Sequence, residues 1–168
     1  MVHHIPGAIS EESAASLLNL YRNSTNTLIE SGVERDRFYS STASHGKFLI
    51  AEFSHSEFAP WWDIIAPQLP GSYELVFARV LKYNPSCYVN PHLDGVLSSA
   101  STSDTSVIIQ LNDSSQYEGG QMMIDHQIPP QMSIGDLVMY SYSTLHAVSE
   151  ITRGLRYVCN LRLKSING

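Results

Sequence analysis

The spacing of apolar residues predicts a helix near the start of the chain. Apolar side chains recur at roughly the 3.6-residue period of an amphipathic helix, at Ala14, Leu17, Leu18, Tyr21 and Leu28. Ser10 is a suitable N-cap, and the two acids that follow it suit the positive end of a helix dipole. We therefore expect a helix from Ser10 to about Glu30, ended by Gly32.

The pattern changes near residue 70, from helical spacing to short strands. Before that point a second helix is expected over Glu57–Leu69, interrupted by Pro60 and Pro67. After it, apolar or alternating runs are bounded by turn residues such as Asn84-Pro85 and Arg153-Gly154. The expected strands are Tyr73–Tyr83, Tyr88–Asp94, Thr105–Leu111, Gly120–Ile124, Asp136–Tyr140, Leu145–Ser149 and Leu155–Leu163. Short strands at this spacing are typical of a sandwich or barrel. Helices packed on one side would cover the sheet that faces away from a binding pocket.

Two segments follow neither pattern. Residues 33–49 are interpreted as loop or short strands, and residues 95–105 are small and polar. The second segment is expected to be a mobile surface loop. If the chain binds a substrate, residues 34–47 and 95–105 would have to grip it, because the chain has little room for a separate binding domain.

Composition and charge restrict the class of protein. The 168 residues are 43% apolar and 15% charged, which suits one folded domain. A formal net charge of −6 argues against a nucleic-acid partner. No apolar run approaches the roughly 18 residues that cross a bilayer, and the N-terminus lacks the features of a signal peptide. We expect a soluble, cytoplasmic protein without a membrane partner, in which Cys87 and Cys159 are reduced thiols; its oligomeric state stays open.

The strongest local motif is Pro91-His92-Leu93-Asp94. Because side chains alternate along a strand, His92 and Asp94 would point to the same side and form a pair of metal ligands. The alternative is a surface ion pair, since this spacing also arises by chance. His146, in a later predicted strand, is a third ligand or else a core histidine. Two histidines and one carboxylate form the facial triad of non-haem Fe(II) oxygenases, which leaves three coordination positions open.

The segments around this triad resemble the 2-oxoglutarate/Fe(II) dioxygenases of the prolyl-4-hydroxylase-like branch. Arg156 follows His146 by ten residues, the spacing of the basic residue in that branch. The other motifs that carry the resemblance are Gln110-Leu111-Asn112-Asp113, Glu118-Gly119-Gly120 and Gly135-Asp136-Leu137-Val138. They stand in the family's order and span about residues 73–163, over half of the chain.

The resemblance implies a mostly β fold with flanking helices. Its core would be a double-stranded β-helix, the jelly-roll of cupin-like proteins, over residues 71–164. N-terminal helices over residues 8–70 would pack on one sheet, so that residues 1–168 form a single dioxygenase domain.

The resemblance also implies the roles of individual residues. His92, Asp94 and His146 would bind Fe(II), and Arg156 would bind the distal carboxylate of the co-substrate 2-oxoglutarate. Tyr83 and Gln110 would line the co-substrate pocket, although core packing is an alternative for Tyr83, and the branch commonly has an aromatic residue where Gln110 stands. The remaining requirements are O2 and, as a reductant, ascorbate (vitamin C).

Alternation along the last strand adds two substrate candidates. Asn160 and Arg162 share the face of Arg156, so Asn160 would approach the metal and Arg162 the pocket mouth. There Arg162 would meet a polar or acidic part of the substrate. The alternative for Arg162 is a solvated charge near the C-terminus.

The function implied is hydroxylation of an unactivated C–H bond, in a prolyl residue of a peptide or protein, with release of succinate and CO2. A free amino acid or another small molecule is the alternative substrate. Two other classes remain less favoured. A nucleic-acid dealkylase has two arginines six residues apart, as Arg156 and Arg162 are, but the negative net charge opposes it. A non-catalytic jelly-roll binding module would not consume 2-oxoglutarate.

Overall fold

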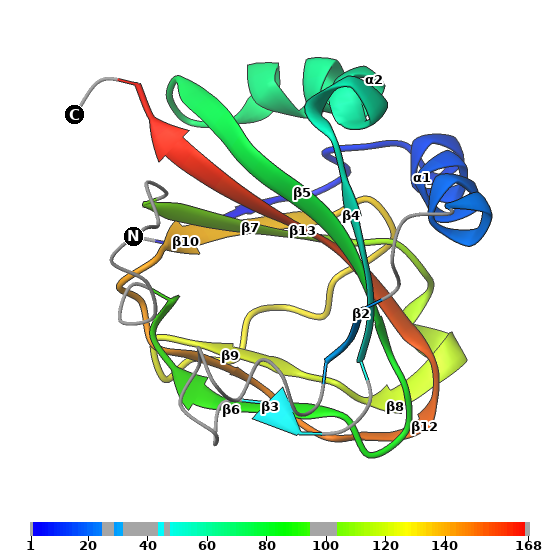
Figure 1. Cartoon of the computed structure of the whole chain (residues 1–168). Helices are drawn as coiled ribbons and strands as arrows, with labels where there is room; N and C mark the ends of the chain where they lie inside the picture. The colour runs from blue at the N-terminus through cyan, green and yellow to red at the C-terminus, as the bar shows by residue number, and fades with distance from the viewer. Residues whose placement is uncertain (1, 25–28, 32–43, 46–47, 95–103, 167–168) are drawn as a thin grey trace.

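Two antiparallel β-sheets face each other and form the body of the molecule (Figure 1). The computed structural model describes residues 2–24, 29–31, 44–45, 48–94 and 104–166. The larger sheet has the strand order β1-β10-β7-β13-β5-β4-β2, the smaller sheet the order β3-β6-β11-β9, and β12 pairs with β8. The predicted mostly β fold with a jelly-roll core is confirmed.

The strands have the following bounds: β1 Val2–Ile5, β2 Ile29–Ser31, β3 Ser44–His45, β4 Phe48–Phe53, β5 Tyr73–Tyr83, β6 Tyr88–His92, β7 Thr105–Gln110, β8 Tyr117–Gly119, β9 Met122–Ile124, β10 Leu137–Ser141, β11 His146–Val148, β12 Ile151–Gly154 and β13 Arg156–Ser165. The helices are α1 (Glu11–Asn23) and α2 (His55–Ile65), and α2 continues into a 3-10 turn over Ala66–Gln68.

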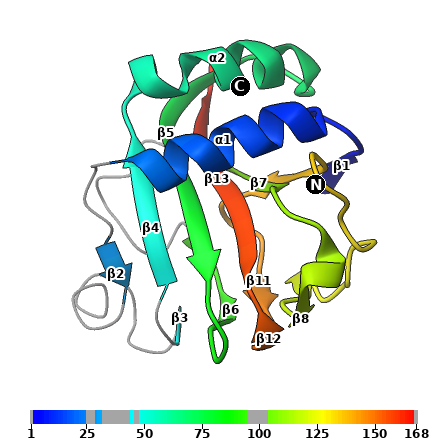
Figure 2. The same cartoon turned by 90° about the vertical axis from the view of Figure 1, so that its right-hand side faces the viewer.

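Both helices cover the outer face of the seven-stranded sheet (Figures 1 and 2), as expected. Leu17 of α1 and Phe58 of α2 are fully buried in one cluster with outward-facing strand residues such as Leu161. Complete burial of one such side chain contributes roughly 1.5–3 kcal/mol. A second cluster lies between the two sheets and includes Ile108 and Val158. The two helices therefore stabilise the seven-stranded sheet from its outer face. The inner face of that sheet remains directed toward the smaller sheet.

Helix α1 is shorter than predicted. Its N-cap is Ser10, whose hydroxyl accepts from the backbone N–H of Ser13, and the helix ends at Asn23. The predicted continuation to Glu30 is wrong, because residues Ile29–Ser31 pair with β4 as strand β2. Asn23 and Ser24 favour helix ends, since their side chains compete for backbone hydrogen bonds. Leu28 and Gly32 lie outside the described residues.

Helix α2 begins two residues earlier than predicted. Ser54 and Glu57 form a capping box, in which each side chain accepts from the other residue's backbone N–H. Pro60 lies inside the helix, and Pro67 lies in the 3-10 turn that follows it. The described residues contain no helix long and apolar enough to cross a membrane.

The strand predictions hold best where the chain is long and regular. β5 has both predicted ends, whereas β1 and β12 were not predicted. The turn expected at Arg153-Gly154 is instead the end of β12. Of the strand expected over Gly120–Ile124, only Met122–Ile124 forms a strand, β9; β8 precedes it and was not predicted, and Gly119 and Gly120 at this junction both have positive φ. A side chain at Gly119 would collide with the carbonyl oxygen of Glu150, at 1.8 Å.

Two further predictions concern the thiols and the polar loop. Cys87 and Cys159 are both buried, and neither forms a disulfide. Residues 95–103 of the predicted mobile loop lie outside the described residues.

Candidate active site

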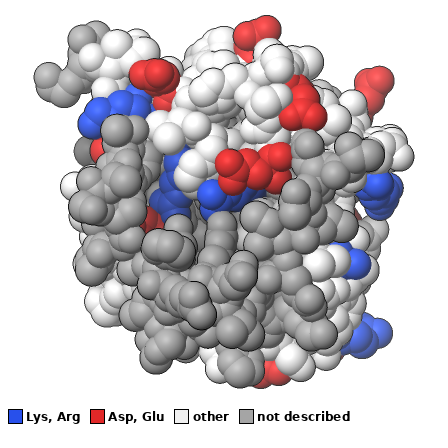
Figure 3. Space-filling view, in the orientation of Figure 1, with Lys and Arg blue, Asp and Glu red and all other residues white. Residues whose placement is uncertain are grey.

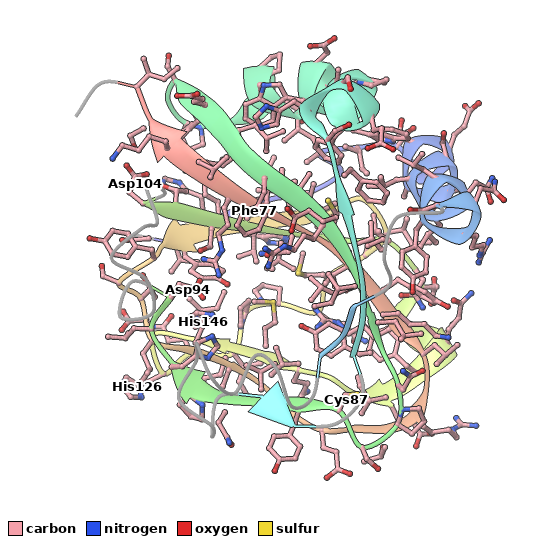
Figure 4. The ribbon with its side chains drawn as sticks, viewed as in Figure 1. Phe77, Cys87, Asp94, Asp104, His126 and His146 are labelled. Carbon is pink, nitrogen blue, oxygen red and sulfur yellow. The ribbon has the colours of Figure 1, made fainter. Side chains whose placement is uncertain are left out.

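The three predicted metal ligands lie close together, and Figure 4 shows two of them, Asp94 and His146, between the two sheets. His92 ends β6 and His146 begins β11, and the two residues are paired directly across the strands, with ring centroids 4.2 Å apart. Asp94 lies two residues beyond the end of β6. Its Oδ1 is 3.6 Å from Nε2 of His92, and its Oδ2 is 3.5 Å from Nε2 of His146.

Backbone carbonyls fix the orientation of both imidazoles. Nδ1 of His92 lies 2.8 Å from the carbonyl oxygen of Asn90, and Nδ1 of His146 lies 2.9 Å from that of Thr144. A carbonyl oxygen only accepts, so Nδ1 carries the proton and the lone pair of Nε2 is directed into the site. Burial lowers the pKa of His146, although the charge of Asp94 opposes this effect. The neutral imidazole is the form that binds a metal.

Asp94 is held in its ionised form. Burial alone raises the pKa of its carboxyl, but the hydrogen bond from Arg162 and the charge of its guanidinium outweigh burial. The net pKa is therefore well below the usual range. Ser106 donates to Oδ2 over 2.8 Å, and Nη1 of Arg162 donates to the same oxygen.

This donor set fits a divalent iron ion. Metal–ligand bonds of about 2.0–2.2 Å place neighbouring ligand atoms of an octahedral ion about 3 Å apart. The observed separations of 3.5 and 3.6 Å are close to that value. Two imidazole nitrogens and one carboxylate oxygen are the ligands of the non-haem Fe(II) facial triad, and three positions would remain open.

Arg156 lies at the other end of the interior, with a buried side chain at the start of β13. Its Nε–H donates to Oε1 of Gln110 over 3.3 Å, and its guanidinium carbon lies 5.3 Å from the centroid of the Tyr83 ring. The amide nitrogen of Gln110 donates in turn to the carbonyl of Asn112. The structure thus brings the three predicted co-substrate residues together, with Gln110 holding Arg156.

Two buried tyrosines lie between the metal end and the arginine end. Burial raises the pKa of both Tyr83 and Tyr140. The charge of Asp94 raises the pKa of each, and the charge of Arg156 lowers it. The Tyr140 ring also lies 4.8 Å from the His146 ring, between centroids.

A cavity of about 500 Å³ adjoins Arg156 and Gln110. Its walls come mainly from the β8–β9 turn and the segment before β10: Ser114, Tyr117, Gly119, Gly120, Gln121, Met122, Ile128, Pro129, Pro130, Gln131 and Met132. None of the three metal ligands lines it, so it extends the interior on the arginine side.

The two residues on β13 that were predicted to contact substrate hydrogen-bond to other parts of the protein. The amide of Asn160 donates to the carbonyl of Val107 over 3.3 Å, and Arg162 bonds to Asp94 and to Ser106. Alternation had placed both residues on the inner face correctly. Their predicted contacts with substrate stay predictions.

The sequence analysis missed several residues around the site. Ser106 and Tyr140 contact the metal ligands, and the available signal was a polar residue at an inward position of a predicted strand. Arg79 was also missed: its Nε donates to Glu52 over 2.7 Å, and its guanidinium lies 3.9 Å above the Phe77 ring. Seen from the side drawn in Figure 1, basic and acidic side chains lie next to each other in the middle of the surface (Figure 3).

The fold is a jelly-roll, and the site between its sheets carries a two-histidine, one-carboxylate set that fits a non-haem iron ion. The family model of the 2OG-Fe(II) oxygenase superfamily matches residues 78–163, and the chain belongs to that family. The predicted membership of the 2-oxoglutarate/Fe(II) oxygenases is therefore confirmed, and that family's requirements are Fe(II), 2-oxoglutarate and O2.

Known proteins similar to the chain include PKHD-type hydroxylases and a prolyl-4-hydroxylase. A PKHD-type hydroxylase of Synechococcus sp. is 35% identical over 71 residues, 40% of this chain and 32% of the relative. One of Prochlorococcus marinus is 28% identical over 164 residues, 90% of this chain and 72% of the relative. The solved prolyl-4-hydroxylase of Pseudomonas putida has a TM-score of 0.68 at 14% identity, over 99% of this chain and 93% of that one. The chain spans between 32% and 39% of the length of the first relatives.

Proposed function

We propose that this protein is a 2-oxoglutarate- and Fe(II)-dependent dioxygenase that hydroxylates an unactivated C–H bond of a prolyl residue in a peptide or protein. The observation that carries the proposal is the convergence of His92, Asp94 and His146, with the buried guanidinium of Arg156 in the same interior. The hydroxylase relatives and the prolyl-4-hydroxylase with the same fold support the choice of reaction and substrate.

One group of residues binds the metal ion, and another residue binds the co-substrate. When bound, Fe(II) with 2-oxoglutarate and O2 supplies the oxidation of the C–H bond, with succinate and CO2 as the other products. His92, Asp94 and His146 hold the ion from one side. Arg156 binds the distal carboxylate of 2-oxoglutarate, because its planar fork matches a carboxylate. A charged hydrogen bond of this kind contributes about 1.5–3 kcal/mol.

The surrounding residues prepare the pocket. Gln110 fixes the guanidinium of Arg156, which reduces the ordering that binding requires. Tyr83 and Tyr140 exclude water between the two ends, and their raised pKa values keep both hydroxyls protonated. Ascorbate as reductant is part of the proposal and rests on the family resemblance.

A small molecule that carries a carboxylate, such as a free amino acid, is the second candidate substrate. The observation that favours it is Arg79, which is partly buried, stacked on Phe77 and fixed through Nε by Glu52. A guanidinium fixed through Nε has its other nitrogens as further donors for a carboxylate.

Uncoupled turnover tests the reaction class. Purified protein with Fe(II), 2-oxoglutarate and ascorbate should form succinate, and a proline-containing peptide or an amino acid should raise the rate if it is a substrate. His92→Ala should abolish succinate formation. Arg153→Gln, an exposed ion-pair residue on β12, is the matched control and should leave it unchanged. No succinate above the His92→Ala background, with a metal-loaded protein, would reject the proposal.

A further inference from the structure

Three inward-facing residues in neighbouring strands are aligned beside the metal site. In the register of the large sheet, Arg162 on β13 is paired with Ser106 on β7, and Ser106 is paired with Tyr140 on β10. Arg162 and Ser106 both donate to the carboxylate of Asp94, and the ring of Tyr140 lies against that of His146. The pairing of the strands therefore points these side chains at the metal ligands.

The donors to Asp94 are unevenly distributed over its two oxygens. A carboxylate oxygen offers about two lone-pair sites. Oδ2 receives the O–H of Ser106 and the N–H of Arg162, whereas Oδ1 lies 3.6 Å from Nε2 of His92. Nη1 of Arg162 also donates to Oγ of Ser106, so the three groups form a closed set of hydrogen bonds.

Both oxygens of Asp94 lie near the site, since Oδ2 is 3.5 Å from Nε2 of His146. Carboxylates bind metals through one oxygen or through two. Two-oxygen binding would use a fourth position of an octahedral ion, and only two would remain. The co-substrate and O2 together need three positions on the ion, so one of these positions would be missing.

We propose that Arg162 and Ser106 are positioning residues that occupy Oδ2 of Asp94 and leave Oδ1 as the single metal-binding oxygen. This inference rests on the proposed function, because it concerns the same metal site. It gives Arg162 a role at the metal that the sequence, which placed it at the pocket mouth, did not indicate. Neither residue touches the ion itself; each acts through Asp94.

Metal affinity, measured calorimetrically with Mn(II) as the probe, tests the proposal on the full chain. Arg162→Met removes all donors at similar side-chain length and should weaken Mn(II) binding by about 10–100-fold, the usual effect of losing a partner of a metal ligand. Arg162→Lys keeps one charged donor and should recover part of that loss. Ser106→Ala removes the second donor, should weaken binding in the same direction, and serves if Arg162→Met fails to fold.

Arg153→Met is the matched control. Arg153 is also bonded to a carboxylate, that of Glu118, but it lies on β12 with an exposed side chain, so its loss should leave the Mn(II) affinity unchanged. Crystals of the Mn(II)-loaded wild type should show one Asp94 oxygen on the ion, and those of Arg162→Met two. Wild-type affinity in both Arg162→Met and Ser106→Ala, or two bound oxygens in the wild type, would overturn the inference.

The proposed function can fail separately. If the wild type binds Mn(II), the variants weaken it, and no succinate forms, the positioning role stands and the dioxygenase proposal falls. If succinate forms and the variants bind Mn(II) as the wild type does, the positioning role falls alone.

Discussion

Two neighbouring rows of residues cross the large sheet and serve opposite purposes. The outer row, Ala78, Leu161, Val107 and Met139, is buried under the helices and entirely apolar. The inner row, one residue away along each strand, is Phe77, Arg162, Ser106 and Tyr140. Because side chains alternate along a strand, a single step moves the chain from the hydrophobic core to the metal site. Stability and chemistry are therefore separable by variants at adjacent positions.

The largest expected effect is at Asp94, the predicted metal ligand that accepts hydrogen bonds from Arg162 and Ser106 of the inner row. Asp94→Asn keeps the shape of the side chain but removes the charge that binds the metal. Succinate formation should fall by about a thousandfold or more, since the loss exceeds the 10–100-fold typical of a ligand's supporting partners. The thermal unfolding of the metal-free protein should remain cooperative. Succinate formation within tenfold of wild type would show that Asp94 is not a metal ligand.

The outer row should show the reverse behaviour. Leu161→Ala leaves a cavity under the helices and should lower the free energy of unfolding by about 2–5 kcal/mol. The turnover number of the folded fraction should stay near the wild-type value, because no inner-row contact changes. Urea unfolding gives the stability, and succinate assays below the transition give the turnover. A large fall in turnover at unchanged stability would contradict the division between the rows.

A smaller effect is expected at the edge of the sheet, where Asp104 joins the ends of β7 and β13. Its carboxylate accepts from the backbone N–H of Ser165 and from the hydroxyl of Thr105. Burial raises the pKa of Asp104, but these hydrogen bonds and that of Lys164 outweigh it, so the pKa lies below its usual value. The stabilisation that the ionised Asp104 carboxylate contributes is fully present at pH values above its unfolded-state pKa of about 3.9. It is lost as the pH falls through the folded-state pKa.

Asp104→Asn should accordingly cost about 1 kcal/mol at pH 7 and less at pH 3. Urea unfolding of both proteins across this range provides the measurement. A difference that grows as the pH falls would have the wrong sign for a depressed pKa.

The smallest expected effect concerns a thiol on the outer face of the sheet. Cys159 faces the helices, and its burial raises the pKa of the thiol. The thiolate is the reactive form, so iodoacetamide should label Cys159 only after unfolding. Rapid labelling of the native protein at this residue, read by mass spectrometry, would show that the outer face opens under native conditions.

Sequence patterns predicted those features that depend on local order. Alternation and motif spacing located His92, Asp94, His146 and Arg156, and the apolar run of β5 gave both of its ends. The inward face of Arg162 was also predictable. Its partner was not, because that depends on the register between β13 and β7, which only the folded sheet defines.

The errors have the same origin. The helical period continued past Asn23 in the sequence, yet residues Ile29–Ser31 form a strand, because pairing with β4 outweighs local propensity. β1 was missed since its four residues gain their strand geometry by adding to the edge of the sheet, beside β10.

The most direct test of the central claim is the binding of 2-oxoglutarate to the Mn(II)-loaded protein, compared with Arg156→Met. The account predicts binding that requires both the metal and the triad, and that weakens by about 10–150-fold without the guanidinium, the equivalent of about 1.5–3 kcal/mol. Equal affinity in the wild type and Arg156→Met, or equal affinity with and without the metal, would contradict it.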